Sequence, residues 1–93
     1  GLTENVYTLK LLNKTEQPQQ YQLKVEGLDE YQWQGEQQVQ VEAGEVYTFA
    51  ISLAVDPYGL KTAITEIEFV VTGETAEGEL LQTRQESRFI AEL

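Results

Sequence analysis

This 93-residue chain contains no cysteine, no histidine and no methionine. Thiolate, imidazole and thioether groups are the ligands that zinc, copper, haem and iron–sulfur clusters take from a protein. Without cysteine there is also no disulfide framework, and the composition is compatible with either side of a membrane. We therefore expect no cofactor and no electron-transfer site in this domain.

Positive charge is scarce as well. Six lysines and arginines stand against 16 aspartates and glutamates, which gives a net charge of −10. Nucleic acids and anionic lipid surfaces attract proteins through a positive patch, so neither is an expected partner. Long apolar runs are also missing, because a membrane-spanning helix needs roughly 18 or more apolar residues in succession. The acidity is interpreted mainly as a solubility feature.

Groups suited to catalysis are equally few. Ser52 and Ser87 have no histidine to act as their base, and an unassisted serine is a weak nucleophile. Glu66 and Glu68 form a carboxylate pair, but general acid–base catalysis needs a cleft that shifts their pKa values. Solvated strand positions are the favoured interpretation of this pair. We predict no catalytic residue, and a domain that is not itself an enzyme.

The most regular feature of the chain is the alternation of apolar and polar residues. In residues 46–55, large apolar side chains take every second position, at Tyr47, Phe49, Ile51, Leu53 and Val55. Because neighbouring side chains of a strand point to opposite faces, this spacing predicts a strand with one apolar face, which a second sheet must cover. Residues 20–26 repeat the pattern in a shorter form.

After a lead-in at residues 1–5, similar patterns predict further strands at residues 6–13, 31–33, 37–42, 63–72 and 79–91. Turn signals rich in proline, glycine and asparagine separate the strands at residues 13–18, 56–59 and 73–78. About seven short strands and no helix indicate an all-β domain, an antiparallel β-sandwich of immunoglobulin-like or fibronectin-like type. We predict that residues 1–93 form this single domain.

The first turn also carries a modification motif. Asn13, Lys14 and Thr15 match the N-glycosylation sequon. A chance match is the favoured interpretation, since asparagine and threonine are expected here for their ability to hydrogen-bond the turn backbone.

Three glutamates of the last hairpin form a candidate metal site. Glu74, Glu77 and Glu79 could gather oxygen ligands for a hard cation such as calcium. The alternative is an ordinary hairpin loop, because Gly73 and Gly78 are explained by the turn alone. The favoured prediction is that the domain binds no metal.

Three aromatic residues form a candidate interaction surface. Tyr31, Trp33 and Tyr58 could present a platform to a sugar or to a protein partner, since such side chains dominate binding hot spots. The alternative, which we favour, is that Trp33 closes one end of the sandwich.

The run from Glu4 to Gly27 resembles the opening of a known domain. A strand with the pattern Asn-x-Tyr leads into an Asn-Lys-Thr turn, and a second strand follows that closes at the glycine. Similar pieces recur at Trp33 and Gly35, at residues 43–45 and at residues 87–89. Together they resemble the C-terminal immunoglobulin-like domain of FixG-type proteins, which are accessory proteins of cbb3-type cytochrome c oxidase.

The resemblance implies a larger parent protein. Full-length members are inner-membrane proteins of Gram-negative bacteria with cysteine motifs for two [4Fe-4S] clusters, and they are linked to oxidase assembly through copper reduction. None of those motifs occurs here, so no redox residue is carried over. By this resemblance, and because the chain begins at Gly1 without methionine, we expect a fragment attached to a membrane through the absent part and located in the periplasm.

Two functional hypotheses follow from these observations. The first is a non-catalytic interaction or spacer domain of a FixG-type oxidoreductase, with an oxidase subunit or a copper-delivery factor as its protein partner. The alternative is a ligand-binding β-sandwich of an extracytoplasmic bacterial protein, with carbohydrate or calcium as its ligand.

Overall fold

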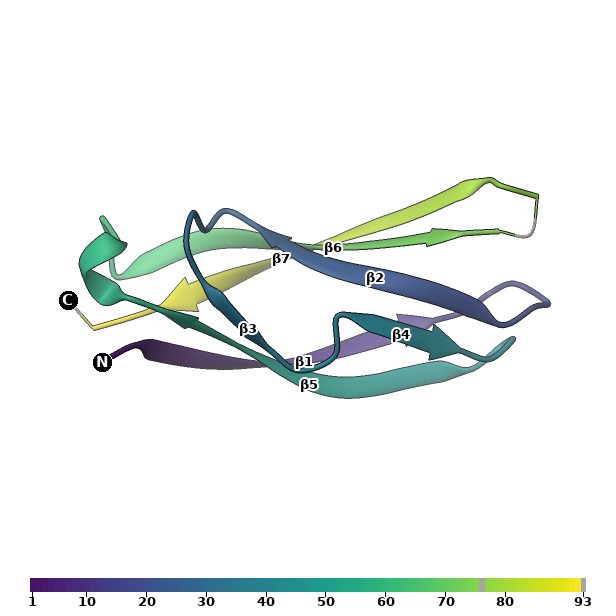
Figure 1. Cartoon of the computed structure of the whole chain (residues 1–93), viewed down its shortest axis with the longest axis horizontal. Coiled ribbons are helices and arrows are strands. Elements are labelled where there is room, and N and C mark those ends of the chain that lie inside the picture. The colour runs from purple at the N-terminus through teal and green to yellow at the C-terminus, as the bar shows by residue number, and fades with distance from the viewer. Residues whose placement is uncertain (76, 93) are drawn as a thin grey trace.

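The computed structural model describes residues 1–75 and 77–92, and it consists of two antiparallel sheets stacked face to face (Figure 1). The first sheet has the order β1-β5-β3, formed by Thr3–Leu12, Val46–Val55 and Gln32–Gln34. The second has the order β4-β2-β6-β7, formed by Gln38–Val41, Gln19–Glu26, Ile64–Glu74 and Leu80–Ile90. The predicted seven-stranded immunoglobulin-like sandwich is thereby confirmed.

Pairing between β1 and β5 forms the centre of the first sheet. The two strands match over their full length, from Thr3 opposite Val55 to Leu12 opposite Val46. The predicted bounds of β5 are confirmed, whereas β1 begins three residues earlier than residue 6. Residues 3–5 show no large apolar alternation, so only the length of the partner strand extends β1 to Thr3.

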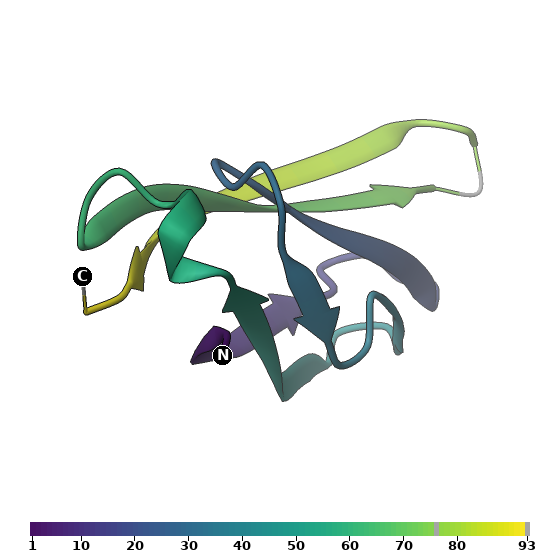
Figure 2. The ribbon, with the colours of Figure 1, turned by 60° about the vertical axis from the view of Figure 1, so that its left-hand side comes forward.

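The hairpin of β6 and β7 pairs from Ile64 opposite Ile90 to Glu74 opposite Leu80. It projects from the end of the molecule opposite to the chain termini (Figure 2). The predicted loop at residues 73–78 is therefore shifted, because Gly73 and Glu74 still belong to β6. The connection comprises residues 75–79, of which Ala76 lies outside the described residues.

The core lies between the two sheets and is centred on Phe69. The ring of Phe69 meets the edges of Tyr7 and Trp33, with centroid separations of 5.0 and 6.1 Å. The other buried residues are the apolar positions that the alternation predicts, mainly Leu9, Leu11, Leu23, Val25, Val39, Val41, Ile51, Leu53, Val55, Ile67 and Phe89. Thr65, which the alternation also places inward, is only partly buried.

Both termini lie at the same end of the molecule (Figure 1). Near this end, side chains of β1 hydrogen-bond to the backbone of β7. The Asn5 side chain donates to the carbonyl of Ile90 at 2.9 Å and accepts from its N–H at 3.0 Å. The Tyr7 hydroxyl donates to the carbonyl of Arg88 at 2.8 Å. These contacts tie the edge of one sheet to the edge of the other.

A single 3-10 turn at Pro57–Gly59 follows β5, where a turn is predicted. The Asp56 carboxylate caps it by accepting from the N–H of Tyr58 at 3.0 Å. Within the described residues, no helix has the length and apolar character needed to cross a membrane.

Candidate functional site

The three aromatic residues of the predicted platform do not share one environment. Tyr31 and Trp33 are partly buried and pack against the core, and the indole N–H of Trp33 donates to the carbonyl of Glu36 at 3.3 Å. Tyr58 on the 3-10 turn is 97% exposed. The structure thus packs Trp33 against the core and leaves Tyr58 as the one aromatic residue of the three that is free of the core.

A depression of about 520 Å³ lies between the loop that precedes Tyr31 and the loop that carries Tyr58. It is lined by residues 27–30 and 59–62, together with Val55, Asp56 and Thr65. Neither Tyr31 nor Tyr58 lines it. The fold therefore brings the two segments together, but not as an aromatic platform.

The three glutamates of the hairpin are also not brought together. Among residues 1–75 and 77–92, no group of three or more acidic, histidine or cysteine side chains has the arrangement of a metal site. The loop that carries Glu77 and Glu79 is held by its own hydrogen bonds: the Thr75 N–H donates to the carbonyl of Glu79 at 2.8 Å, and the Glu79 N–H donates to the Thr75 hydroxyl at 3.0 Å. These hydrogen bonds close the loop around Gly78, whereas Gly73, which the turn was expected to explain, belongs to β6.

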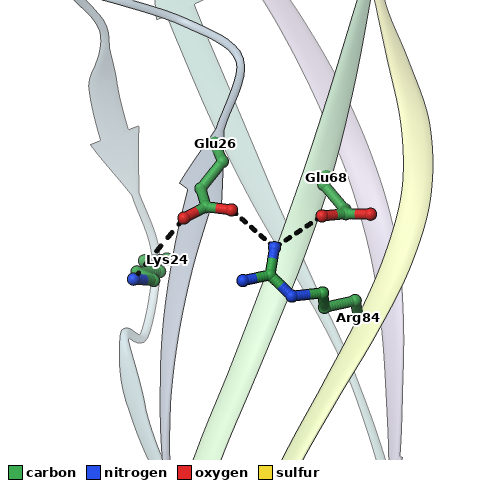
Figure 3. A network of polar contacts seen from close by, with 4 residues as sticks. All are labelled: Lys24, Glu26, Glu68 and Arg84. Atoms are coloured by element: carbon green, nitrogen blue, oxygen red, sulfur yellow. Dashed lines mark hydrogen bonds and ion pairs between the residues drawn. The ribbon is translucent and has the colours of Figure 1, made fainter.

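The outer face of the second sheet carries an ion network that spans three strands (Figure 3). Nη1 of Arg84 on β7 lies 2.6 Å from Oε1 of Glu68 on β6 and 2.6 Å from Oε1 of Glu26 on β2. Lys24 adds a second, longer contact to Glu26, at 3.7 Å. Glu66, the other member of the carboxylate pair, lies 3.4 Å from Arg88. Both glutamates of that pair are therefore engaged by arginines of β7.

Arg84 shifts the titration of Glu26. Its hydrogen bond and positive charge lower the pKa of Glu26 below 4.5, since both favour the ionised carboxylate. The same bonds to Glu26 and Glu68 raise the pKa of Arg84 itself. A lowered carboxyl pKa is the opposite of what a general acid needs, so the network supports a structural role.

Val70 was not anticipated as a buried residue by the alternation. It points to the outer face, between inward-facing Phe69 and Val71, yet it is fully buried. Its cross-strand neighbours are Lys24 and Arg84, whose aliphatic stems are long enough to cover it while their charged heads stay in water. The break in the polar face of β6 could have signalled such a covered position.

Asn13 lies in the turn that the sequence predicts, and its side chain holds that turn together. The sequence pattern alone does not indicate this role. Its side-chain amide donates to the carbonyls of Gln17 and Val41, at 2.7 and 2.9 Å. Its oxygen accepts from the N–H and the hydroxyl of Thr15, at 2.9 and 2.7 Å. Asn13 is completely buried, and its side-chain nitrogen makes both of its hydrogen bonds within the fold.

Comparison with known proteins identifies the family to which the chain belongs. Residues 1–92 match a protein family described as "IG-like fold at C-terminal of FixG, putative oxidoreductase". The chain belongs to this FixG C-terminal family. Its structure also matches the crystal structure of a FixG-related protein from Vibrio parahaemolyticus, with a TM-score of 0.86 and 46% sequence identity, over 99% of this chain and 82% of that chain. Among curated proteins, none matches the chain.

Membership of the FixG C-terminal family confirms the resemblance inferred from residues 4–27 and its later pieces. The family description calls FixG a "putative oxidoreductase" and assigns no chemistry to the immunoglobulin-like fold. The network at Arg84 and the turn at Asn13 accordingly describe how a FixG C-terminal domain is held together.

Proposed function

We propose that this FixG C-terminal domain is a non-catalytic interaction and spacer module of a membrane-bound iron–sulfur oxidoreductase that acts in the assembly of cbb3-type cytochrome c oxidase. The full-length parent would reduce copper destined for the oxidase with its [4Fe-4S] clusters. The domain would lie in the periplasm and would be attached to the inner membrane through the remainder of the parent. Its partner would be an oxidase subunit or a copper-delivery factor.

The observation that carries this proposal is family membership over residues 1–92, in a chain without cysteine, histidine or methionine. A domain with this composition lacks the side chains that hold iron–sulfur clusters or copper in proteins. Its own contribution to an oxidoreductase is therefore to bind or to position. The ion network on the outer face agrees with this, because it uses its charges to tie strands together.

The ligand-binding alternative has less support. Tyr31 and Trp33 pack against the core, whereas the side chain of Tyr58 is exposed to solvent. The glutamates of the hairpin loop do not gather into a site within the described part of the chain. Neither of the two features from which carbohydrate or calcium binding was inferred therefore favours it.

The proposal is tested in the full-length parent by deleting residues 1–93 and measuring how much active oxidase the cell assembles. We expect oxidase activity to fall while the truncated parent still accumulates. Parent protein must be quantified in the same cells, because a loss of stability would imitate a loss of function.

A replacement variant separates the interaction role from the spacer role. An unrelated immunoglobulin-like sandwich of similar length, placed at the same position, would preserve spacing and remove any specific surface. If oxidase assembly is restored by the replacement, the domain is a spacer only. Normal oxidase levels in the deletion variant itself would contradict both roles.

A further inference from the structure

The two sheets of the sandwich differ in size, and the difference leaves one side uncovered. The first sheet has three strands and ends at β1, whereas the second has four and ends at β7. On β7, Thr83 and Gln85 stand opposite Val71 and Phe69, so they share the inward face of the sheet. Both are nevertheless exposed to solvent. Among the residues that the structure describes, no strand of the first sheet covers this part of β7.

A groove of about 470 Å³ occupies the uncovered region. One wall is formed by Leu9 and Leu11 of β1, the other by residues 81–85 of β7, and Phe69 and Tyr21 contribute to the apolar lining. The groove starts where the bridges from Asn5 and Tyr7 to β7 stop. It is therefore the open continuation of an edge that is closed nearer the termini.

The edge of β1 along this groove has unpaired backbone groups. The N–H of Asn13 points to Glu45 beyond β5, and N–H groups alternate in direction along a strand. The N–H and carbonyl groups of Thr8, Lys10 and Leu12 therefore point away from β5. Within the described residues β1 has no second neighbouring strand, so these groups are available to an added strand.

The charge beside the groove is unlike that of the rest of the molecule. Its lining includes Lys10, Lys14 and Arg84 and no aspartate or glutamate, in a chain of net charge −10. Arg84 is engaged by two glutamates, but Lys10 and Lys14 form no ion pair within the part of the chain that the structure describes. Charges more than roughly 8–10 Å away are largely screened at physiological salt. These local cations therefore dominate the electrostatic potential at a peptide bound in the groove.

We propose that the groove binds an extended peptide segment of a protein partner, which adds as a fourth strand to the edge of β1. Every second side chain of this peptide is apolar and enters the groove, where it covers Thr83 and Gln85. The side chains between them are acidic and lie beside Lys10 on the outer face. Backbone pairing supplies the affinity, and the alternating pockets and charges supply the specificity, as in other cases of strand addition. This inference rests on the proposed interaction role and names its surface.

The probe is a soluble octapeptide in which valine and glutamate alternate, titrated into the isotopically labelled 93-residue chain and followed by NMR. We expect saturable shifts of the amides of residues 8–12 and 81–86. A peptide with four valines followed by four glutamates has the same composition and should bind at least several-fold more weakly. A peptide that alternates valine and lysine should show no saturable binding.

Two variants of the protein separate the local charge from the net charge. Lys10→Glu should weaken binding of the alternating valine–glutamate peptide by about three- to tenfold, the effect expected when an exposed ion pair is replaced by a repulsion. Lys61→Glu makes the same change in a loop that lines the other depression, and should leave the affinity unchanged. Equal effects of the two variants would overturn the local role of Lys10.

Backbone pairing is tested with two N-methylated forms of the octapeptide, one methylated on its valines and one on its glutamates. Residues of one type direct their N–H groups to one edge of a strand, so one form should lose binding and the other should keep it. Equal binding by both forms would contradict strand addition. Sedimentation of the free domain as a dimer that Lys10→Glu dissociates, together with no binding of the octapeptide to the dimer, would show a second copy in the groove and would also overturn the proposal.

Failure of this inference is distinguishable from failure of the proposed function. If the octapeptide does not bind but deletion of residues 1–93 abolishes oxidase assembly, the interaction role stands and the groove is the wrong surface. If the peptide binds and oxidase is assembled normally without the domain, the groove is a binding site that oxidase assembly does not need.

Discussion

The ring of Tyr21 lies where a side chain at Gly73 would have to stand. The two residues face each other on β2 and β6, and a Cβ built on Gly73 would lie 2.9 Å from Cδ1 of Tyr21 and 3.0 Å from Cε1. Such separations are shorter than van der Waals contact. The absence of a side chain at position 73 therefore allows the Tyr21 ring to lie against Gly73 of β6 and to line the groove between β1 and β7.

Replacing Gly73 by alanine should destabilise the domain, because the added methyl group must displace the buried Tyr21 ring. We expect a loss of about 1–3 kcal/mol, the usual cost of overpacking. Chemical denaturation of the purified domain measures it. Gly59→Ala is the matched control, since a Cβ there meets nothing within 4 Å and should cause no loss. Equal stability of both variants would show that Tyr21 moves aside without cost.

The Asn13 turn predicts a second stability effect. Asn13→Ala would leave the carbonyl of Val41 and the N–H of Thr15 without their partner in a buried or partly buried site. We expect a loss of about 1–3 kcal/mol or more, because unsatisfied buried polar groups keep their full desolvation cost. Lys14→Ala, an exposed position in the same turn, should be near neutral. Thermal unfolding of both variants checks this, and a near-neutral Asn13→Ala would mean that water replaces the amide.

How far the sequence predicts this fold depends on the range of the interactions involved. Residues 46–55 were placed correctly because the alternation of a strand is local. The start of β1 at Thr3 and the continuation of β6 through Gly73 were not, because both depend on partner strands distant in the sequence. Glycine near a hairpin is normally a turn signal, and its role as a site of close approach to Tyr21 appears only once the strands are paired.

Candidate functional residues were harder to predict for a related reason. Tyr31 and Trp33 have the residue types of a binding surface, but the same types fill a core, and burial decides between them only in the folded chain. The groove beside β1 has no sequence motif at all. It arises from the unequal number of strands in the two sheets, and that number follows from long-range pairing.

The Arg84 network should be visible in the acid titration of the domain. In Arg84→Gln, the pKa of Glu26 should rise toward its ordinary value of 4.5, because the largest causes of its lowering are removed. Carboxyl chemical shifts followed against pH measure this. Arg88→Gln is the control, since Arg88 contacts Glu66 at 3.4 Å and takes no part in the contacts of Glu26. An unchanged Glu26 midpoint in Arg84→Gln would contradict the network.

The same lowering fixes how Arg84 affects stability at acidic pH. A carboxyl group whose pKa is lower in the folded state stabilises the fold above its unfolded pKa, and this contribution is lost as the pH falls through the folded pKa. The stability of the unsubstituted domain should therefore decline below pH 4.5, partly through protonation of Glu26. The decline should be shallower in Arg84→Gln, as measured by urea unfolding at a series of acidic pH values.

At alkaline pH the tyrosines should set the limit of stability, and Tyr7 should contribute most clearly. Burial raises the pKa of Tyr7 from 10.0 to about 12, and the pKa of Tyr21 is raised by the same cause. The neutral ring is the form that the folded state accommodates, so between these values the folded chain binds more protons than the unfolded one. Stability must then fall as the pH rises above 10.

Tyr7→Phe separates the hydroxyl group from the ring. The variant keeps the edge contact with Phe69 and loses the hydrogen bond to the carbonyl of Arg88, so at neutral pH we expect a loss of about 1 kcal/mol. Above pH 10 the stability of the variant should fall less steeply than that of the unsubstituted domain, since the Tyr7 hydroxyl, which ionises on unfolding, is gone. Urea unfolding at pH 7 and between pH 9 and 12 checks both expectations. Parallel curves for the two proteins in the alkaline range would show that Tyr7 ionises as easily in the fold as in the unfolded chain. Equal stability of the two proteins at pH 7 would show that the hydrogen bond of Tyr7 to the carbonyl of Arg88 does not help to hold the edges of β1 and β7 together.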